Sequence, residues 1–289
     1  MKNLGLLSRL FSRVENMTNK QSRKEDLLYG LVLPSLTGVE IGPLDKPIIL
    51  RSESKILYAD HADTESLRKK YANDTSVNAD AIPGIDIILA GNNLAASAGH
   101  DSLDYIVASH VIEHTPDFIG FLLDCVHALR EGGVLCLAVP DCRYTFDVFR
   151  RHTFLEDVEI AHTSVATRPS LDQVIDHAKN IVDLDQGLAW ENRPLALQKA
   201  RLKHLRSNIP RLIEMHQSGQ YMDVHCWVFT PGAFLRLTNK VCLKYKIPLG
   251  IRRFVSTRYM KNEFLVQLVK LSDDRDIAAS WPDNLLQDN

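Results

Sequence analysis

The sequence predicts an α/β fold built on a parallel sheet with helices between its strands. Between residues 36 and 142, short apolar runs of strand length alternate with stretches that have helical periodicity. The runs are apolar throughout, as is typical of parallel strands buried on both faces. This alternation implies right-handed crossovers and a doubly wound sheet, which binds ligands at the carboxyl ends of its strands. The expected strands are Gly38–Ile41, Lys55–Asp60, Asp86–Ala90, Leu103–Ser109 and Val134–Val139.

Helices are expected between these strands. Residues Thr64–Tyr71 and Pro116–Arg130 have helical spacing, and the second stretch is expected to end at Gly132 and Gly133 as its C-cap. Residues 143–222 break the rhythm and predict a helical insertion without strands, which we interpret as a cover over the substrate.

Two helix starts are marked by their caps. Ser170 and Gln173 have capping-box spacing, which predicts a helix that reaches about Leu184. Thr230 followed by Pro231 is typical of an N-cap and first helical position, and that helix is expected to reach about Lys244. Two strands should follow as a hairpin, and the chain after Leu271 is expected to be polar and loose. These strands are Leu249–Ser256 and Glu263–Lys270.

The N-terminal residues predict an amphipathic helix over residues 2–16, followed by a polar linker over 17–25. The helix either packs on the domain or docks weakly on a membrane surface or a partner. Arg9 and Arg13 interrupt its apolar run, which argues against a signal peptide. We divide the chain into a helix and linker (1–30), a ligand-binding core (31–142), a helical insertion (143–222) and a segment that completes the core (223–289).

The composition excludes several classes of protein. A chain of 289 residues with a net charge of −2 has no overall basic field of the kind that binds nucleic acid. No apolar stretch reaches the roughly 18 residues that a membrane span needs. The five cysteines are an odd number without C-x-x-C spacing, so we expect reduced thiols and a cytoplasmic protein.

A nucleoside site is predicted where the first two strands end. The first strand runs into Gly42, whose lack of a side chain lets backbone approach a ligand, and the second strand ends at Asp60, whose carboxylate suits ribose hydroxyls. The first loop reads E-I-G-P and not G-x-G-x-x-G, so no cradle for a pyrophosphate is evident. The pattern favours a nucleoside ligand without a second phosphate-linked half.

A histidine-rich motif follows the fourth strand. His110, Glu113 and His114 match H-x-x-E-H, a zinc-hydrolase pattern that requires both histidines on one helix. Because these residues follow a strand directly and Pro116 comes next, we expect a turn and no metal site, and zinc hydrolysis is kept only as an alternative.

Taken together, the motifs EIGP, YAD, DYIVASHVIEH and ALREGGVLCLAVPD resemble the class I S-adenosylmethionine-dependent methyltransferases, in their type 11-like branch. The segments HCWVFTPGAFLRL and NEFLVQLVK resemble the helix and hairpin that close that fold. Within the branch, SHVIEHTPD with VPDCRYTFD resembles bacterial enzymes of surface-polysaccharide and glycan synthesis. The resemblance implies a Rossmann-like sheet of seven strands with the last strand antiparallel.

The resemblance also implies roles for individual residues. Gly42 and Glu40 would border the methionine end of S-adenosylmethionine, and Asp60 would hold the ribose diol. Ser109 and His110 would line the floor of the site. Where the family usually has an acidic adenine contact, this chain has Ala90-Gly91-Asn92-Asn93, so Asn92 or Asn93 would have to substitute.

Methyl transfer to a hydroxyl requires a base, and histidine suits that task near neutral pH. The candidates are His110, His114 and His225, with Asp223 as a group that could orient His225; each histidine also fits a structural role. Asp141, Arg143 and Tyr144 are candidate substrate contacts. The expected reaction is O-methylation of a sugar, glycan or similar hydroxyl acceptor. Nitrogen or carbon methylation, and a catalytically weak module that serves as a partner protein, stay open as alternatives.

Overall fold

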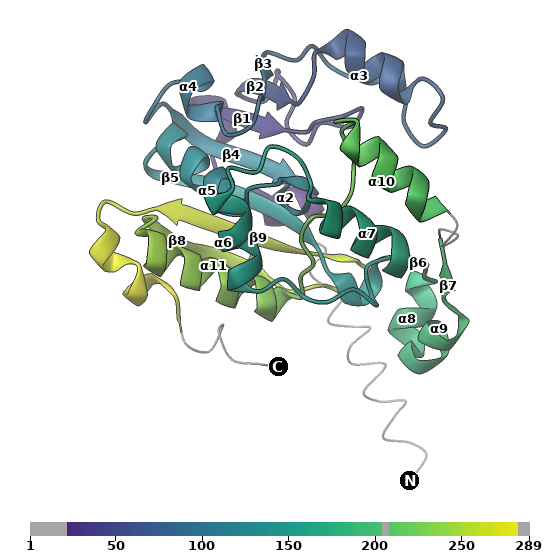
Figure 1. Cartoon of the computed structure of the whole chain (residues 1–289). Coiled ribbons are helices and arrows are strands. Elements are labelled where there is room, and N and C mark those ends of the chain that lie inside the picture. Colours follow the sequence, from purple (N-terminus) through teal and green to yellow (C-terminus); the bar gives the residue numbers. More distant parts are fainter. Residues whose placement is uncertain (1–21, 204–207, 283–289) are drawn as a thin grey trace.

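A computed structural model describes residues 22–203 and 208–282 (Figure 1). It contains a seven-stranded sheet in the order β3-β2-β1-β4-β5-β9-β8. The first five strands of this order pair in parallel, and β9 is antiparallel to both of its neighbours. The predicted α/β, Rossmann-like fold with an antiparallel last strand is confirmed. The strands are β1 Thr37–Ile41, β2 Lys55–Asp60, β3 Ile87–Ile88, β4 Leu103–Ser109, β5 Leu129–Pro140, β8 Leu249–Val255 and β9 Glu263–Lys270.

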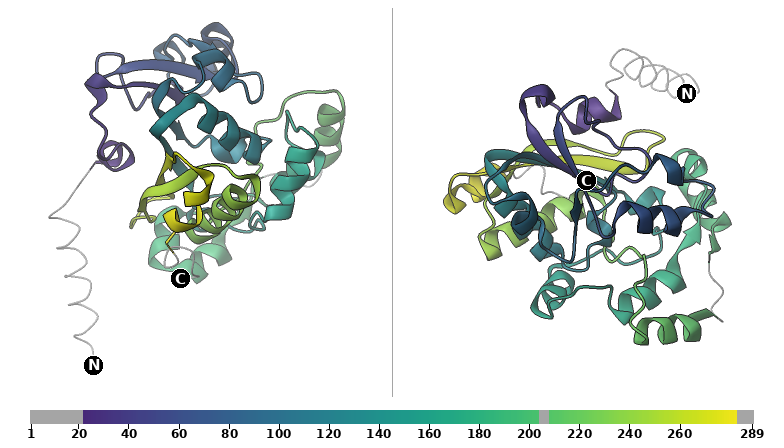
Figure 2. Two further views of the ribbon diagram at one scale, coloured as in Figure 1. Left: turned by 90° about the vertical axis from the view of Figure 1, so that its left-hand side faces the viewer. Right: turned by 90° about the horizontal axis from the view of Figure 1, so that it is seen from above.

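Helices cover the two faces of this sheet unequally. Four helices pack on one face, over the larger apolar core, and the short helix α2 (Arg23–Leu27) packs on the opposite face with Ile49 and Tyr58 (Figure 2). Residues 22–25 of the predicted linker therefore belong to a cap and a packed helix, because Leu27 is buried against the sheet. The helices of the larger face are α4 Leu94–Ala98, α5 Phe118–Ala128, α6 Leu155–Thr163 and α11 Pro231–Tyr245.

The insertion is mostly helical and lies beside the carboxyl edge of the sheet (Figure 1). Its capping box at Ser170 is confirmed: Ser170 Oγ accepts from the backbone N–H of Gln173, and Gln173 Oε1 accepts from that of Ser170. The expectation of no strands is wrong, because two short strands pair antiparallel. The elements are α7 Leu171–Asn180, β6 Val182–Asp183, α8 Gln186–Glu191, α9 Arg193–Lys199, β7 Arg201–Leu202 and α10 Ile209–Gln217, while α3, at Thr64–Tyr71, belongs to the core.

Two other boundaries differ from the prediction. Helix α5 ends at Ala128 and β5 begins at once with Leu129, since Leu129 pairs with Leu103 in the sheet. Residues 272–282, expected to be loose, are held by Trp281, which is 3% exposed and donates from Nε1 to the carbonyl of Leu249. In both places, burial against the sheet overrides a local sequence signal.

The Thr230 cap and the hairpin of β8 and β9 are confirmed. Within residues 22–203 and 208–282, no helix is long and apolar enough to cross a bilayer. The predicted N-terminal helix at residues 2–16 lies outside the described residues.

Candidate active site

The candidate site lies at the carboxyl edge of the sheet, where the strand order reverses between β1 and β4. Gly42 turns the chain out of β1 with a φ of +68°, and its N–H donates to the carbonyl of Ala59 at 2.9 Å. A Cβ at Gly42 would lie 3.0 Å from Cγ2 of Val111, which follows β4. The glycine therefore allows the loops after β1 and β4 to meet closely.

Asp60 ends β2 beside this turn and is 8% exposed. Its Oδ1 accepts from the backbone N–H of His61 at 2.7 Å and lies 2.6 Å from His61 Nδ1. Both contacts use one carboxylate oxygen, which leaves Oδ2 as the group suited to a ligand hydroxyl.

Glu40 of β1 forms hydrogen bonds with the loop that follows this strand. Its two carboxylate oxygens accept from the N–H groups of Ile48 and Ile49, at 2.8 and 3.0 Å, and it is 2% exposed. Burial raises its pKa against the opposing effect of these hydrogen bonds. Glu40 thus fixes the loop between β1 and β2, which contains no helix. Its contact with a cofactor stays a prediction.

The two predicted asparagines are tied into their own surroundings. Asn93 Oδ1 accepts from the N–H of Ala90 at 2.9 Å, and Asn92 Nδ2 donates to Asp117 Oδ2 at 3.2 Å. They shape the loop after β3, and an adenine contact from either residue stays a prediction.

The turn after β4 is anchored by two residues that the sequence patterns did not reveal. Arg23 donates to Ser109 Oγ at 2.6 Å and forms a two-pronged ion pair with Glu263 of β9. His110 Nε2 lies 2.9 Å from Glu263 Oε2, on a left-handed backbone with a φ of +54°. Only the tertiary contact between α2, β4 and β9 identifies Arg23 and Glu263.

These charges shift the pKa values on both sides of the contact. Burial disfavours the charged form of His110, but the carboxylates of Glu113 and Glu263 outweigh it and raise the pKa of His110 to about 9. Burial likewise opposes ionisation of Glu263, and Arg23 and His110 outweigh it, lowering that pKa to about 2. His110 is therefore a protonated neighbour near neutral pH and a poor base.

Glu113, His114 and His225 form the chemical centre of the site. Glu113 is completely buried, and its Oε1 lies 4.0 Å from Nε2 of each of the two histidines. As expected, Ile112–His114 is a single 3₁₀ turn, η3, and not a longer helix. Burial alone would raise the pKa of Glu113, but the surrounding histidines hold it below its usual value.

Each histidine of this cluster has a carboxylate on its other ring nitrogen. His225 Nδ1 donates to Asp147 Oδ2 at 2.5 Å, and His114 Nδ1 lies 2.9 Å from Asp223 Oδ1. Asp223, expected to orient His225, pairs with His114 instead, and Asp147 occupies Nδ1 of His225. Asp147 was missed, although it lies in the quoted motif VPDCRYTFD.

Backbone hydrogen bonds bring His225 to Glu113 from the far end of the insertion. The N–H groups of Cys226 and Trp227 donate to the carbonyl of Glu113, at 2.7 and 3.2 Å. The indole Nε1 of Trp227 donates to the carbonyl of Thr115 at 2.6 Å. The segment before α11 is thereby fixed against η3.

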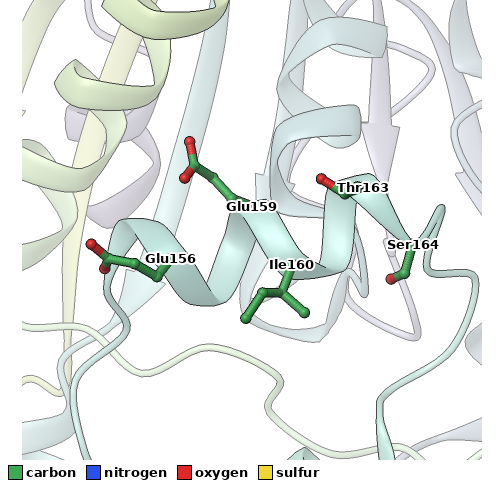
Figure 3. A pocket seen from close by; sticks show the side chains of 5 residues that line it. All are labelled: Glu156, Glu159, Ile160, Thr163 and Ser164. Atoms are coloured by element: carbon green, nitrogen blue, oxygen red, sulfur yellow. The ribbon is translucent and has the colours of Figure 1, made fainter.

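A pocket of about 240 Å³ opens beside this cluster, between the sheet edge and the insertion. Its wall combines aromatic and polar groups, including His110, Tyr144, Phe146, Asp183, Lys203 and His225. A second, more open hollow of about 450 Å³ runs along helix α6 (Figure 3). Its five lining side chains all belong to that helix and its C-cap, and none belongs to the cluster, so we place no chemistry there.

The three predicted substrate contacts differ in their surroundings. Asp141 is fully buried, and its oxygens accept from Arg143 at 2.7–3.1 Å and from Thr257 at 2.6 Å. Tyr144 lines the pocket and stacks on Trp190, with ring centroids 3.9 Å apart. Asp141 and Arg143 thus stabilise the loop that carries Tyr144; a direct substrate contact of the three stays a prediction.

We compared the chain with protein-family models, curated proteins and solved structures. No protein-family model and no curated protein matches the chain. Similar solved structures include a protein provisionally described as a Zn-dependent alcohol dehydrogenase from Rhodobacter sphaeroides (14% identity, 88% of this chain and 92% of that one, TM-score 0.46). Others are S-adenosylmethionine-dependent methyltransferases from Methanosarcina mazei (14%, 85% and 97%, 0.43) and Mesorhizobium loti (13%, 86% and 98%, 0.43). Likeness at this level decides nothing about activity.

Proposed function

We propose that the chain binds S-adenosylmethionine and transfers its methyl group to a hydroxyl of a sugar, glycan or similar small acceptor. The observation that carries the proposal is the meeting of Gly42, Asp60 and the His110 turn at the β1–β4 reversal, beside a pocket lined by His225. A glycine turn and a carboxylate at adjacent strand ends suit a nucleoside, and the short E-I-G-P loop disfavours a dinucleotide.

Within this proposal, Gly42 admits the methionine end of the cofactor and Asp60 Oδ2 accepts from the ribose hydroxyls. Ser109 and His110 form the floor. Glu40 keeps the loop after β1 in place through Ile48 and Ile49. The sulfonium supplies the reactive methyl group, so the protein's tasks are alignment and removal of a proton.

His225 is the best-placed base among the three candidate histidines. Asp147 accepts from Nδ1, which leaves the lone pair of Nε2 for a proton. The acceptor O–H bond breaks as its proton passes to Nε2, the O–CH₃ bond forms, and the S–CH₃ bond breaks to leave a thioether. The aromatic and polar pocket wall suits a hydroxyl-rich acceptor with apolar ring faces.

The five buried, unpaired thiols are consistent with a reducing compartment, and we propose a cytoplasmic location.

Calorimetric titration with S-adenosylmethionine tests the cofactor assignment. We expect saturable binding that weakens at least tenfold in Asp60→Ala, a loss of about 1.4 kcal/mol. Asp80→Ala, at an exposed acidic position outside the proposed site, is the control and should bind as the wild type does. Labelled cofactor with a panel of glycans, amines and carbon acids would then identify the acceptor class.

A wild-type protein that folds but shows no binding would contradict the enzyme proposal. That outcome would favour a methyltransferase-like module that acts as a partner protein. This second candidate is favoured by the side chains of Asn92 and Asn93, which are already hydrogen-bonded within the chain and so are less able to bind adenine.

A further inference from the structure

The cluster at η3 has the composition and spacing of a metal site. Glu113, His114 and His225 each offer one ligand atom, and these three atoms lie within 4.8 Å of one another. Bonds of about 2.0–2.2 Å to zinc would place tetrahedral ligands about 3.4 Å apart. The two 4.0 Å separations around Oε1 therefore require only small side-chain rotations to close on an ion.

The outer contacts of the two histidines match those of metal ligands. Metal-binding histidines commonly donate their other ring N–H to a carboxylate, which fixes the tautomer and the ring orientation. Here His225 Nδ1 donates to Asp147, and His114 Nδ1 lies 2.9 Å from Asp223 Oδ1 as an ion pair without hydrogen-bond geometry. The Nε2 atoms of both histidines lie on the side of Glu113, each 4.0 Å from its Oε1.

Glu113 supplies an independent observation. Both of its carboxylate oxygens are buried without a hydrogen-bond partner among the described residues. His110 Nδ1 forms an ion pair with Oε1 at 3.5 Å, a distance longer than the usual hydrogen bond. A buried carboxylate in this state is costly, and a bound cation would satisfy it.

We propose that Glu113, His114 and His225 bind one divalent transition-metal ion, with Zn²⁺ as the expected occupant. Two imidazoles and one carboxylate suit zinc and related ions, whereas Mg²⁺ and Ca²⁺ prefer all-oxygen sets. Three protein ligands leave a coordination position open. His225 lines the pocket, so we expect the open position to face the acceptor.

The proposed metal ligands differ from those that the sequence motif suggested. H-x-x-E-H would pair His110 with His114, but the turn directs His110 Nε2 to Glu263 and brings His225 in from before α11. From the sequence we expected no metal site, so this ion would be a correction to that expectation.

The role of the ion, unlike its binding, rests on the proposed function. An acceptor hydroxyl on the ion would have a lowered pKa and lose its proton to pocket water. Its oxygen would then bond to the methyl carbon as the S–CH₃ bond breaks. Because the ion occupies Nε2 of His225, it would replace that nitrogen as the group that activates the acceptor.

Metal titration of the full-length chain without a histidine tag tests the site. After chelation and dialysis, we expect one Zn²⁺ per chain by calorimetry, and Co²⁺ should give the visible absorption of a four-coordinate site. Mg²⁺ should not compete. Glu113→Gln and His114→Gln should each weaken Zn²⁺ binding at least tenfold, and Asp223→Asn by about 10–100-fold.

His100→Ala is the matched control, since His100 is exposed and precedes β4 whereas Glu113 follows it, so the Zn²⁺ affinity of this variant should not change. Thermal unfolding of each variant distinguishes lost ligands from lost structure. Should His114→Gln fail to fold, the wild-type stoichiometry and Co²⁺ spectrum still decide. No saturable Zn²⁺ binding by the wild type, or equal binding by all folded variants, would overturn the proposal. Asp60→Ala should retain Zn²⁺, so failure of the cofactor assignment and failure of the metal site are separate results.

Discussion

Asp147 and His225 are 78 positions apart in the chain and share a buried hydrogen bond of 2.5 Å between Oδ2 and Nδ1. Asp147 Oδ1 also accepts from Arg150 at 2.8 Å, and Arg150 in turn donates to Asp176 at 2.7 Å. Asp147, near the start of the insertion, thus fixes the orientation of His225, which follows the end of the insertion. Asp147 is a positioning residue, because it acts on the reacting groups through the orientation of His225.

Replacing Asp147 by Asn should therefore impair turnover more than substrate binding. With His225 Nε2 as the base, without an ion on it, we expect kcat to fall by about 10²–10⁴-fold, the usual contribution of a positioned base, with little change in KM and an altered pH profile. Asp176→Asn is the matched control, since it also contacts Arg150 but not His225. Equal effects of the two substitutions on kcat would mean that Asp147 has only a structural role.

Gly42→Ala should damage both the turn and the ligand site. The left-handed φ of +68° costs an alanine about 1–2 kcal/mol, and its Cβ would crowd Val111 at 3.0 Å. Urea unfolding should show this loss, and calorimetry should show weaker S-adenosylmethionine binding. Gly84→Ala is the control, because nothing lies within 4 Å of its added Cβ, and it should match the wild type in both measurements.

The ion pairs of Glu263 predict acid sensitivity. Its pKa in the folded protein is about 2, below the ordinary 4.5, so its stabilisation is present above about pH 4.5 and is lost as the pH falls toward 2. The free energy of unfolding should drop by up to about 3 kcal/mol over that window. Urea titrations at several pH values measure the drop, and Glu263→Gln should show a shallower one. An unchanged slope in the variant would contradict the assignment.

Trp281 should be essential to the C-terminal packing. Trp281→Ala removes a buried ring and should cost about 3–5 kcal/mol of unfolding free energy. Trp281→Phe keeps most of the apolar volume and loses the bond to Leu249, so it should cost about 1 kcal/mol. Urea denaturation compares them, and a negligible loss in Trp281→Ala would show that the segment does not contribute to stability.

Features encoded by a few adjacent residues could be predicted from the sequence. Strand Lys55–Asp60, the Ser170 capping box and the Thr230-Pro231 helix start agree with the structure because apolar runs and caps depend on local backbone geometry. The predictions fail where packing prevails. Leu129 joins β5 because it meets Leu103 across the sheet, and Trp281 is ordered because the sheet offers it an apolar surface.

The sequence by itself determined the α/β class, the glycine turn at Gly42 and the carboxylate at the end of β2. These follow from periodicity and from residue types that one strand end brings together. Only the tertiary structure decided that His225 joins His110 and His114 around Glu113. Strand order and the hydrogen bonds of Cys226 and Trp227 to Glu113 set that contact. Such pairings join groups more than a hundred residues apart, so no local pattern encodes them.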